Sequence, residues 1–135
     1  MADKEFLPEN FARRSGIGQD DTELRRWLRS RPVTERLAFI NELFGHNYRY
    51  AISLTRSSQL PIEDIVQLLQ GWLLLGKHNC SYGLMQGLIP LLGERKFWTT
   101  AAKLELTPDM SDFLNYHSHG KLRNYVTEIK SPTAS

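Results

Sequence analysis

Residues 61–92 decide the fold class, and they read PIEDIVQLLQGWLLLGKHNCSYGLMQGLIPLL. In 62–75 the apolar residues recur at the helical period and share one wide face. In 82–92 nearly every residue is apolar or glycine, and only Gln86 is plainly polar. A helix with almost no polar face needs other helices to cover it, because water would otherwise surround its apolar side chains. The stretch therefore predicts the buried centre of a packed helical domain.

Helix start signals elsewhere in the chain also indicate a series of helices. Pro61 suits the first turn of a helix, and Thr107 followed by Pro108 forms a second such signal. No stretch alternates apolar and polar residues for long enough to indicate a strand. We therefore predict an all-α fold, a single compact domain of about six to eight helices arranged as a bundle or as stacked helical hairpins.

The two ends of the chain differ from its middle. Residues 1–19 contain Pro8, Gly16 and Gly18 among scattered charges, which predicts an irregular N-terminal arm. Residues 20–130 hold the periodic apolar segments and are predicted to form the single α-helical domain. Residues 131–135 read SPTAS, which predicts a disordered tail.

Composition bounds the class of protein. Among 135 residues, 41% are hydrophobic and 24% are charged, which is typical of a globular domain with its own core. The one cysteine, Cys80, cannot form an internal disulfide and fits a reducing compartment. The first residues carry no secretory signal, and the apolar window at 62–75 is too short to cross a bilayer. We therefore expect a soluble, cytoplasmic (intracellular) protein with no membrane partner and no cofactor.

Basic residues gather in one part of the chain, although the net charge is only +2. Between residues 24 and 36 there are five arginines and one acid, Glu35. On a helix that starts near Asp21, Arg25 and Arg29 would share a face and Arg26 would lie beside them. Arginine and tyrosine are enriched at protein interfaces. The predicted contact surface consists of Arg25, Arg26, Arg29, Tyr48, Arg49 and Tyr50.

These features favour a non-enzymatic macromolecular interaction module, either a protein-binding or an adaptor and regulatory domain. The same arginines (Arg25, Arg26 and Arg29) leave nucleic-acid binding as an alternative, which would show a steep dependence of affinity on salt. In a third interpretation, the arginines form a solvated helix face, and nearby acidic residues balance their charge. The aromatic content is also compatible with homo-oligomerisation.

A second alternative is a small enzyme or metal site around His78, Cys80, His117 and His119. Two ligands spaced two residues apart point to opposite sides of a helix, so both pairs would have to lie in turns. Cys80 stands near a helix start, where a thiol can be activated, but cysteine is also a common apolar filler of cores. No recognisable catalytic set or metal motif accompanies these residues, so we favour a protein without enzymatic activity.

Overall fold

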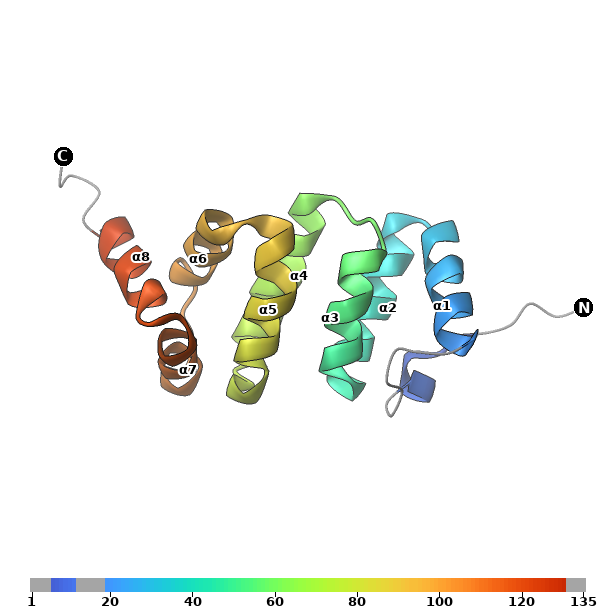
Figure 1. Cartoon of the computed structure of the whole chain (residues 1–135), viewed down its shortest axis with the longest axis horizontal. Coiled ribbons are helices and arrows are strands. Elements are labelled where there is room, and N and C mark those ends of the chain that lie inside the picture. Colours follow the sequence, from blue (N-terminus) through green and yellow to red (C-terminus); the bar gives the residue numbers. More distant parts are fainter. Residues whose placement is uncertain (1–5, 12–18, 131–135) are drawn as a thin grey trace, which may run out of the picture. The chain divides into compact units, whose positions relative to one another are not determined.

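The computed structural model describes residues 6–11 and 19–130, which form eight α-helices and no strand (Figure 1). Of the described residues, 83% are helical. The all-α fold and the predicted range of helix number are therefore confirmed. None of the described helices combines the length and the hydrophobicity that crossing a bilayer would take.

The chain divides into two compact units, residues 1–61 and residues 62–135. The expectation of a single domain over 20–130 stays a prediction. Within the predicted irregular arm, the described part contains a short 3₁₀ helix, η1, at Pro8–Phe11. The rest of that arm, 1–5 and 12–18, and the predicted tail, 131–135, lie outside the described residues.

The described part of the first unit consists of η1 and three helices, α1 (Gln19–Ser30), α2 (Val33–His46) and α3 (Tyr48–Ser57). Helix α1 buries Leu24 and Leu28, which lie one turn apart as the amphipathic pattern requires. The 3₁₀ helix η1 packs on these helices through an aromatic ring. The Phe11 ring makes edge contacts with Phe39 and Tyr50, with centroids 6.3 and 5.9 Å away. This small core therefore closes around α2.

The second unit contains α4 (Ile62–Leu74), η2 (His78–Cys80), α5 (Ser81–Leu92), α6 (Glu94–Ala102), α7 (Pro108–Ser118) and α8 (Lys121–Lys130). Helix α5 packs against α4, α6 and α7, and α8 packs against α6 and α7. The signal at Thr107 is confirmed, because its hydroxyl accepts a hydrogen bond from the Met110 amide at 3.2 Å and Pro108 occupies the first turn. Helix α5 is thus central to this unit.

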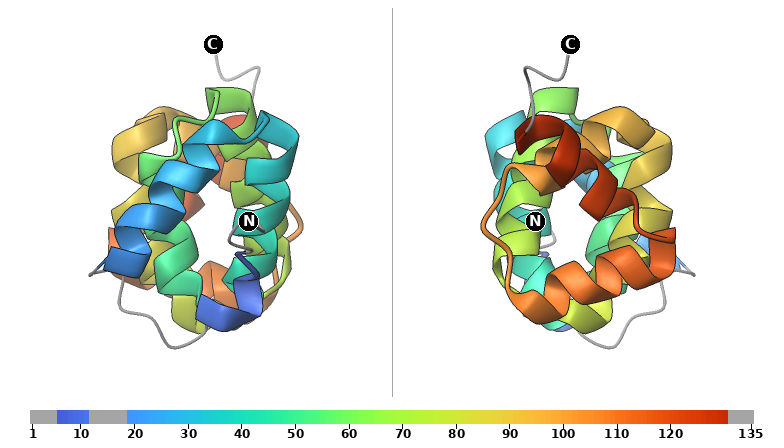
Figure 2. Two further views of the ribbon diagram at one scale, coloured as in Figure 1. Left: turned by 90° about the vertical axis from the view of Figure 1, so that its right-hand side faces the viewer. Right: turned by 90° about the vertical axis from the view of Figure 1, so that its left-hand side faces the viewer.

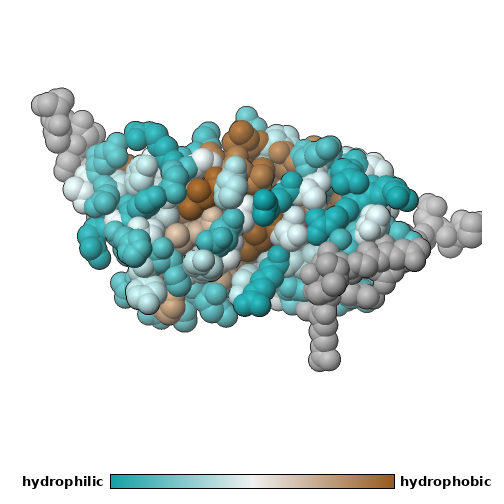
Figure 3. All heavy atoms as spheres, in the orientation of Figure 1, coloured by the Kyte–Doolittle hydropathy of each residue, from teal (hydrophilic) through white to brown (hydrophobic). Residues whose placement is uncertain are grey.

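The prediction that α5 lacks a solvent face is only partly right. Leu84 and Leu88 are fully buried, as expected for a core helix. However, Tyr82, Gln86 and Pro90 are exposed, and their spacing of four residues places them along one side of the helix. Figure 3 shows hydrophobic residues gathered over α5, on the face of the molecule that it draws. Apolar composition alone therefore did not distinguish a helix covered all round from one that presents an apolar side to solvent.

Residues in left-handed conformations turn the chain between helices of the second unit. Gly76 has φ +72° after α4, and Gly93 has φ +87° after α5. Between α7 and α8 the chain turns through His119 at φ 58° and Gly120 at φ 89°, a turn visible in the right-hand view of Figure 2. Glycine adopts this conformation without steric cost, and histidine adopts it more readily than most residues. These turns bring α7 and α8 together and place His117 and His119 beside α5 and α6.

Candidate functional site

One residue of the predicted contact surface, Arg25, makes its hydrogen bonds inside the first unit. The Arg25 Nε donates to both carboxylate oxygens of Asp21 at 2.9 Å. Its Nη2 donates to Ser53 Oγ at 2.9 Å, and its Nη1 donates to Ser57 Oγ. Tyr50 Oη also donates to Asp21, at 2.6 Å. Arg25 therefore connects α1 with α3 and is not a free contact residue.

The structure buries Tyr50 inside the first unit, where only 3% of the residue is exposed, so its predicted contact with a partner has no support from its position. Arg26, Arg29 and Arg49 are exposed. Tyr48 is half-buried, and its ring has Arg49 over it with 5.7 Å between the guanidinium carbon and the ring centroid. Sequence spacing could not separate these cases, since the inward position of Arg25 and Tyr50 depends on how α1 packs on α3.

Cys80 does not have the environment of a nucleophile. The residue is fully buried, and its thiol donates a hydrogen bond to the Lys77 carbonyl at 2.9 Å. Burial raises the pKa of the Cys80 thiol from its ordinary value of 9.0 to about 11. A reactive cysteine needs both access and a stable thiolate, and Cys80 has neither. It is the apolar filler that the sequence left as an alternative.

We expect Cys80 to react slowly with thiol reagents in the folded protein. The rise of the pKa from 9.0 to about 11 lowers the thiolate fraction at pH 8 by roughly 100-fold, and burial slows access further. The rate of iodoacetamide labelling should therefore be at least about 100-fold lower in native protein than in urea-unfolded protein. Equal rates would show an accessible thiol and would support the enzyme alternative.

Two of the predicted histidines belong instead to a cluster of aromatic rings in the second unit. Its members are contributed by η2, α5 and α7, and we call them the aromatic surface: His78, Tyr82, Phe113, Tyr116 and His117. The His78 ring stacks on Phe113 with 4.7 Å between centroids. His117 lies 5.0 Å from Tyr82, 5.2 Å from Tyr116 and 6.1 Å from Phe113 by the same measure.

Three residues of the aromatic surface are exposed to solvent to different degrees. Tyr82 is 51% exposed, Phe113 is 39% exposed and Tyr116 is 77% exposed. The apolar face that α7 packs on the core contains Met110 and Leu114. Phe113 and Tyr116 lie outside that face. Sequence reasoning missed these residues as a site, although their position beside a complete apolar stripe was a usable signal.

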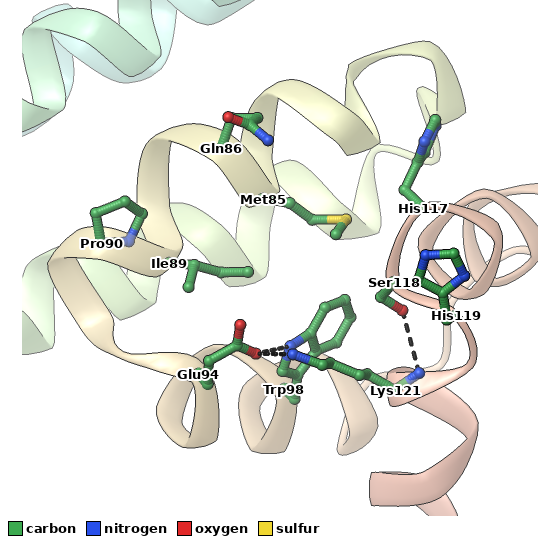
Figure 4. A pocket seen from close by; sticks show the side chains of 10 residues that line it. All are labelled: Met85, Gln86, Ile89, Pro90, Glu94, Trp98, His117, Ser118, His119 and Lys121. Carbon is green, nitrogen blue, oxygen red and sulfur yellow. Dashed lines mark hydrogen bonds and ion pairs between the residues drawn. The ribbon is translucent and has the colours of Figure 1, made fainter.

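A groove of about 360 Å³ opens next to the aromatic surface (Figure 4). Met85 and Ile89 extend from α5 toward the Trp98 ring of α6, which gives the groove an apolar lining. Along one edge the Glu94 carboxylate accepts hydrogen bonds from Trp98 Nε1 at 2.8 Å and from Lys121 Nζ at 2.9 Å. The Lys121 ammonium, followed by the Trp98 N–H, lowers the pKa of Glu94. This edge therefore carries a fixed, compensated charge pair.

His117 belongs to both features, since it lines the groove and contacts three rings of the aromatic surface. The groove and the aromatic surface are therefore one continuous candidate binding site. His119 also lines the groove, from its left-handed position at the end of α7. Exposed rings beside a small apolar groove can hold the apolar side chains of another molecule. Compared with known proteins, the chain matches no family model, no curated sequence and no solved structure.

The residues of the alternative enzyme or metal site do not converge among the described residues. Neither His78, Cys80, His117 nor His119 takes part in a group of three ligand atoms within 4.8 Å of one another. Cys80 is buried away from solvent, and the two imidazoles of the aromatic surface face other rings. The described part of the chain does contain one such group elsewhere, formed by Glu9, Glu42 and His46.

Proposed function

We propose that this protein is an intracellular, non-enzymatic module that binds another protein through the aromatic surface and the adjoining groove of its second unit. The observation that carries the proposal is the position of His117, which joins three exposed rings to an apolar groove. Such a pairing of exposed aromatic area with a small pocket is the arrangement from which strong contact residues of interfaces are usually built.

Contacts within the aromatic surface favour binding because they hold the rings in place before a partner arrives. Phe113 contacts the rings of both His78 and His117, and His117 also contacts Tyr82. A side chain that is already ordered loses little rotamer freedom on association. The groove adds a place for one or two apolar side chains of the partner, because Met85 and Ile89 line it.

The exposed arginines of α1 support binding less strongly than the aromatic surface does. With the Arg25 donors used by Asp21, Ser53 and Ser57, only Arg26 and Arg29 remain exposed on that part of α1. Phosphate recognition usually needs several cations side by side. Nucleic-acid binding therefore stays the alternative, and a variant of these two arginines tests it.

Replacing both Tyr82 and Tyr116 by alanine should weaken partner binding by about ten-fold without unfolding the protein. Each ring is more than half exposed, so the change in the free energy of unfolding should stay near 0.5 kcal/mol per residue. An interface aromatic typically contributes more than about 1.4 kcal/mol to binding, which is a factor of ten in the dissociation constant. We expect quantitative affinity capture from cell lysate to retain partners about ten-fold less well on Tyr82→Ala/Tyr116→Ala than on wild type.

Two control variants separate the explanations. Ile62 is 48% exposed and lies in the second unit, outside the aromatic surface. The Ile62→Ala variant therefore removes exposed apolar area elsewhere in that unit and should leave capture unchanged. Arg26→Ala/Arg29→Ala removes the exposed arginines of α1 and should also leave capture unchanged. If capture falls with the arginine variant and persists with the tyrosine variant, the contact surface lies on the first unit. Nucleic acid among the captured material would then favour the alternative.

A further inference from the structure

Three side chains of the first unit meet at its surface, and none of them belongs to the proposed binding site. Glu42 and His46 lie four residues apart on α2 and so share a face of that helix. Glu9 comes from η1, which packs against α2. One carboxylate oxygen from each glutamate and one imidazole nitrogen lie within 4.8 Å of one another.

The approach of Glu9 to α2 depends on packing that involves other residues. Phe11, two residues after Glu9, is buried and contacts the rings of Phe39 and Tyr50. The Asn47 side-chain amide also donates to the Phe11 carbonyl at 3.1 Å. These contacts hold η1 on α2 whether or not the three side chains interact. The cluster is therefore assembled by the fold of the first unit.

The three side chains also have their ligand atoms available. All three are exposed, and none makes a hydrogen bond or an ion pair with another described residue. Two carboxylates this close to each other repel one another electrostatically. A cation between them would remove that repulsion, and the neighbouring imidazole would supply a third donor.

We propose that Glu9, Glu42 and His46 form a binding site for a first-row divalent transition-metal ion, with Zn²⁺ as the probe. Each glutamate would supply one oxygen and His46 one nitrogen, and water would complete the coordination shell, since the site is open to solvent. The imidazole donor favours such an ion over Mg²⁺ or Ca²⁺, which prefer sites made of oxygen ligands. Bound metal would tie η1 to α2.

The required movement is small. Ligands that share a metal ion with bonds of about 2.1 Å lie roughly 3 to 4 Å apart, so side-chain rotations at three exposed residues close the site. Because these side chains are not held rigidly, we expect a dissociation constant on the order of micromolar rather than the far tighter values of closed structural zinc sites. The site is independent of the proposed protein-binding function.

The test is a calorimetric titration of the full chain with Zn²⁺. Wild type should bind one equivalent, and Glu42→Gln, His46→Gln and Glu9→Gln should each weaken binding by about ten-fold or more. Glu105→Gln, which neutralises an exposed glutamate outside the cluster, should bind as wild type does. Mg²⁺ at the same concentration should give no comparable heat. Loss of affinity in Glu9→Gln is the decisive result, because Glu42 and His46 alone would make only a helical pair.

The proposal is overturned if wild type shows no saturable Zn²⁺ binding up to about 1 mM, or if the three cluster variants bind as wild type does. It is equally overturned if His117→Gln, and not His46→Gln, removes the binding, since the ion would then lie in the second unit. Backbone amide shifts in NMR spectra of wild type keep the test valid should a variant fold poorly. Zn²⁺ should move the signals around residues 9, 42 and 46, and shifts confined to other residues would contradict the assignment.

Discussion

Replacing Trp98 by alanine should lower the free energy of unfolding by about 3–5 kcal/mol. Trp98 is fully buried, and its ring makes an edge contact with Phe97 at 4.8 Å between centroids. The change removes a large apolar side chain and leaves a cavity between α6 and its neighbours, which the surrounding helices fill only partly. It also removes the indole donor of Glu94. Urea unfolding followed by circular dichroism measures the loss.

A second variant separates packing from hydrogen bonding at this position. Trp98→Phe keeps most of the apolar volume but loses the indole N–H, so we expect a smaller loss, about 1–2 kcal/mol. Lys121 continues to pair with Glu94 in this variant. A loss below about 1 kcal/mol for Trp98→Ala would mean that α6 is not packed as described.

Arg25→Ala should destabilise the protein by about 2–4 kcal/mol, although the residue looks like one of several surface arginines in the sequence. Its guanidinium donates to Asp21, Ser53 and Ser57, and its side chain is 19% exposed. Removal leaves the Asp21 carboxylate, which is 13% exposed, without its cation. Tyr50 alone would then donate to that carboxylate. Thermal or urea unfolding reports the change.

Arg29→Ala is the matched control, because Arg29 lies one turn further along the same helix and is exposed. Its loss should change the free energy of unfolding by no more than about 0.5 kcal/mol. A double-mutant cycle of Arg25→Ala with Asp21→Ala should show a coupling of about 1 kcal/mol or more. Equal effects of Arg25→Ala and Arg29→Ala would contradict the network between α1 and α3.

Local patterns in the sequence predicted most of the helical architecture. The start of α4 after Pro61 and the start of α7 at Thr107 depend on residues next to each other in the chain. The end of α4 is followed by Gly76 in the left-handed conformation, which is also a local signal. Because such features do not depend on tertiary packing, composition and spacing were enough to predict these helix boundaries.

The candidate site could not be predicted in this way, because it depends on contacts between distant residues. His78 stacks on Phe113, which lies 35 positions later in the chain. Arg25 bonds to Ser53 and Ser57, 28 and 32 positions away. The sequence therefore placed the contact surface on the arginines, one of which turns inward. It did not indicate that η2, α5 and α7 would bring five rings together.

The most direct measurement of the proposed function is the dissociation constant of the partner that wild-type protein captures most strongly. It should be measured with purified components for wild type and for Tyr82→Ala/Tyr116→Ala, at low and at moderate salt. Binding through the aromatic surface predicts that the double variant binds about ten-fold or more weakly and that salt changes the wild-type value little. An unchanged dissociation constant in the double variant, with the protein still folded, would contradict this account.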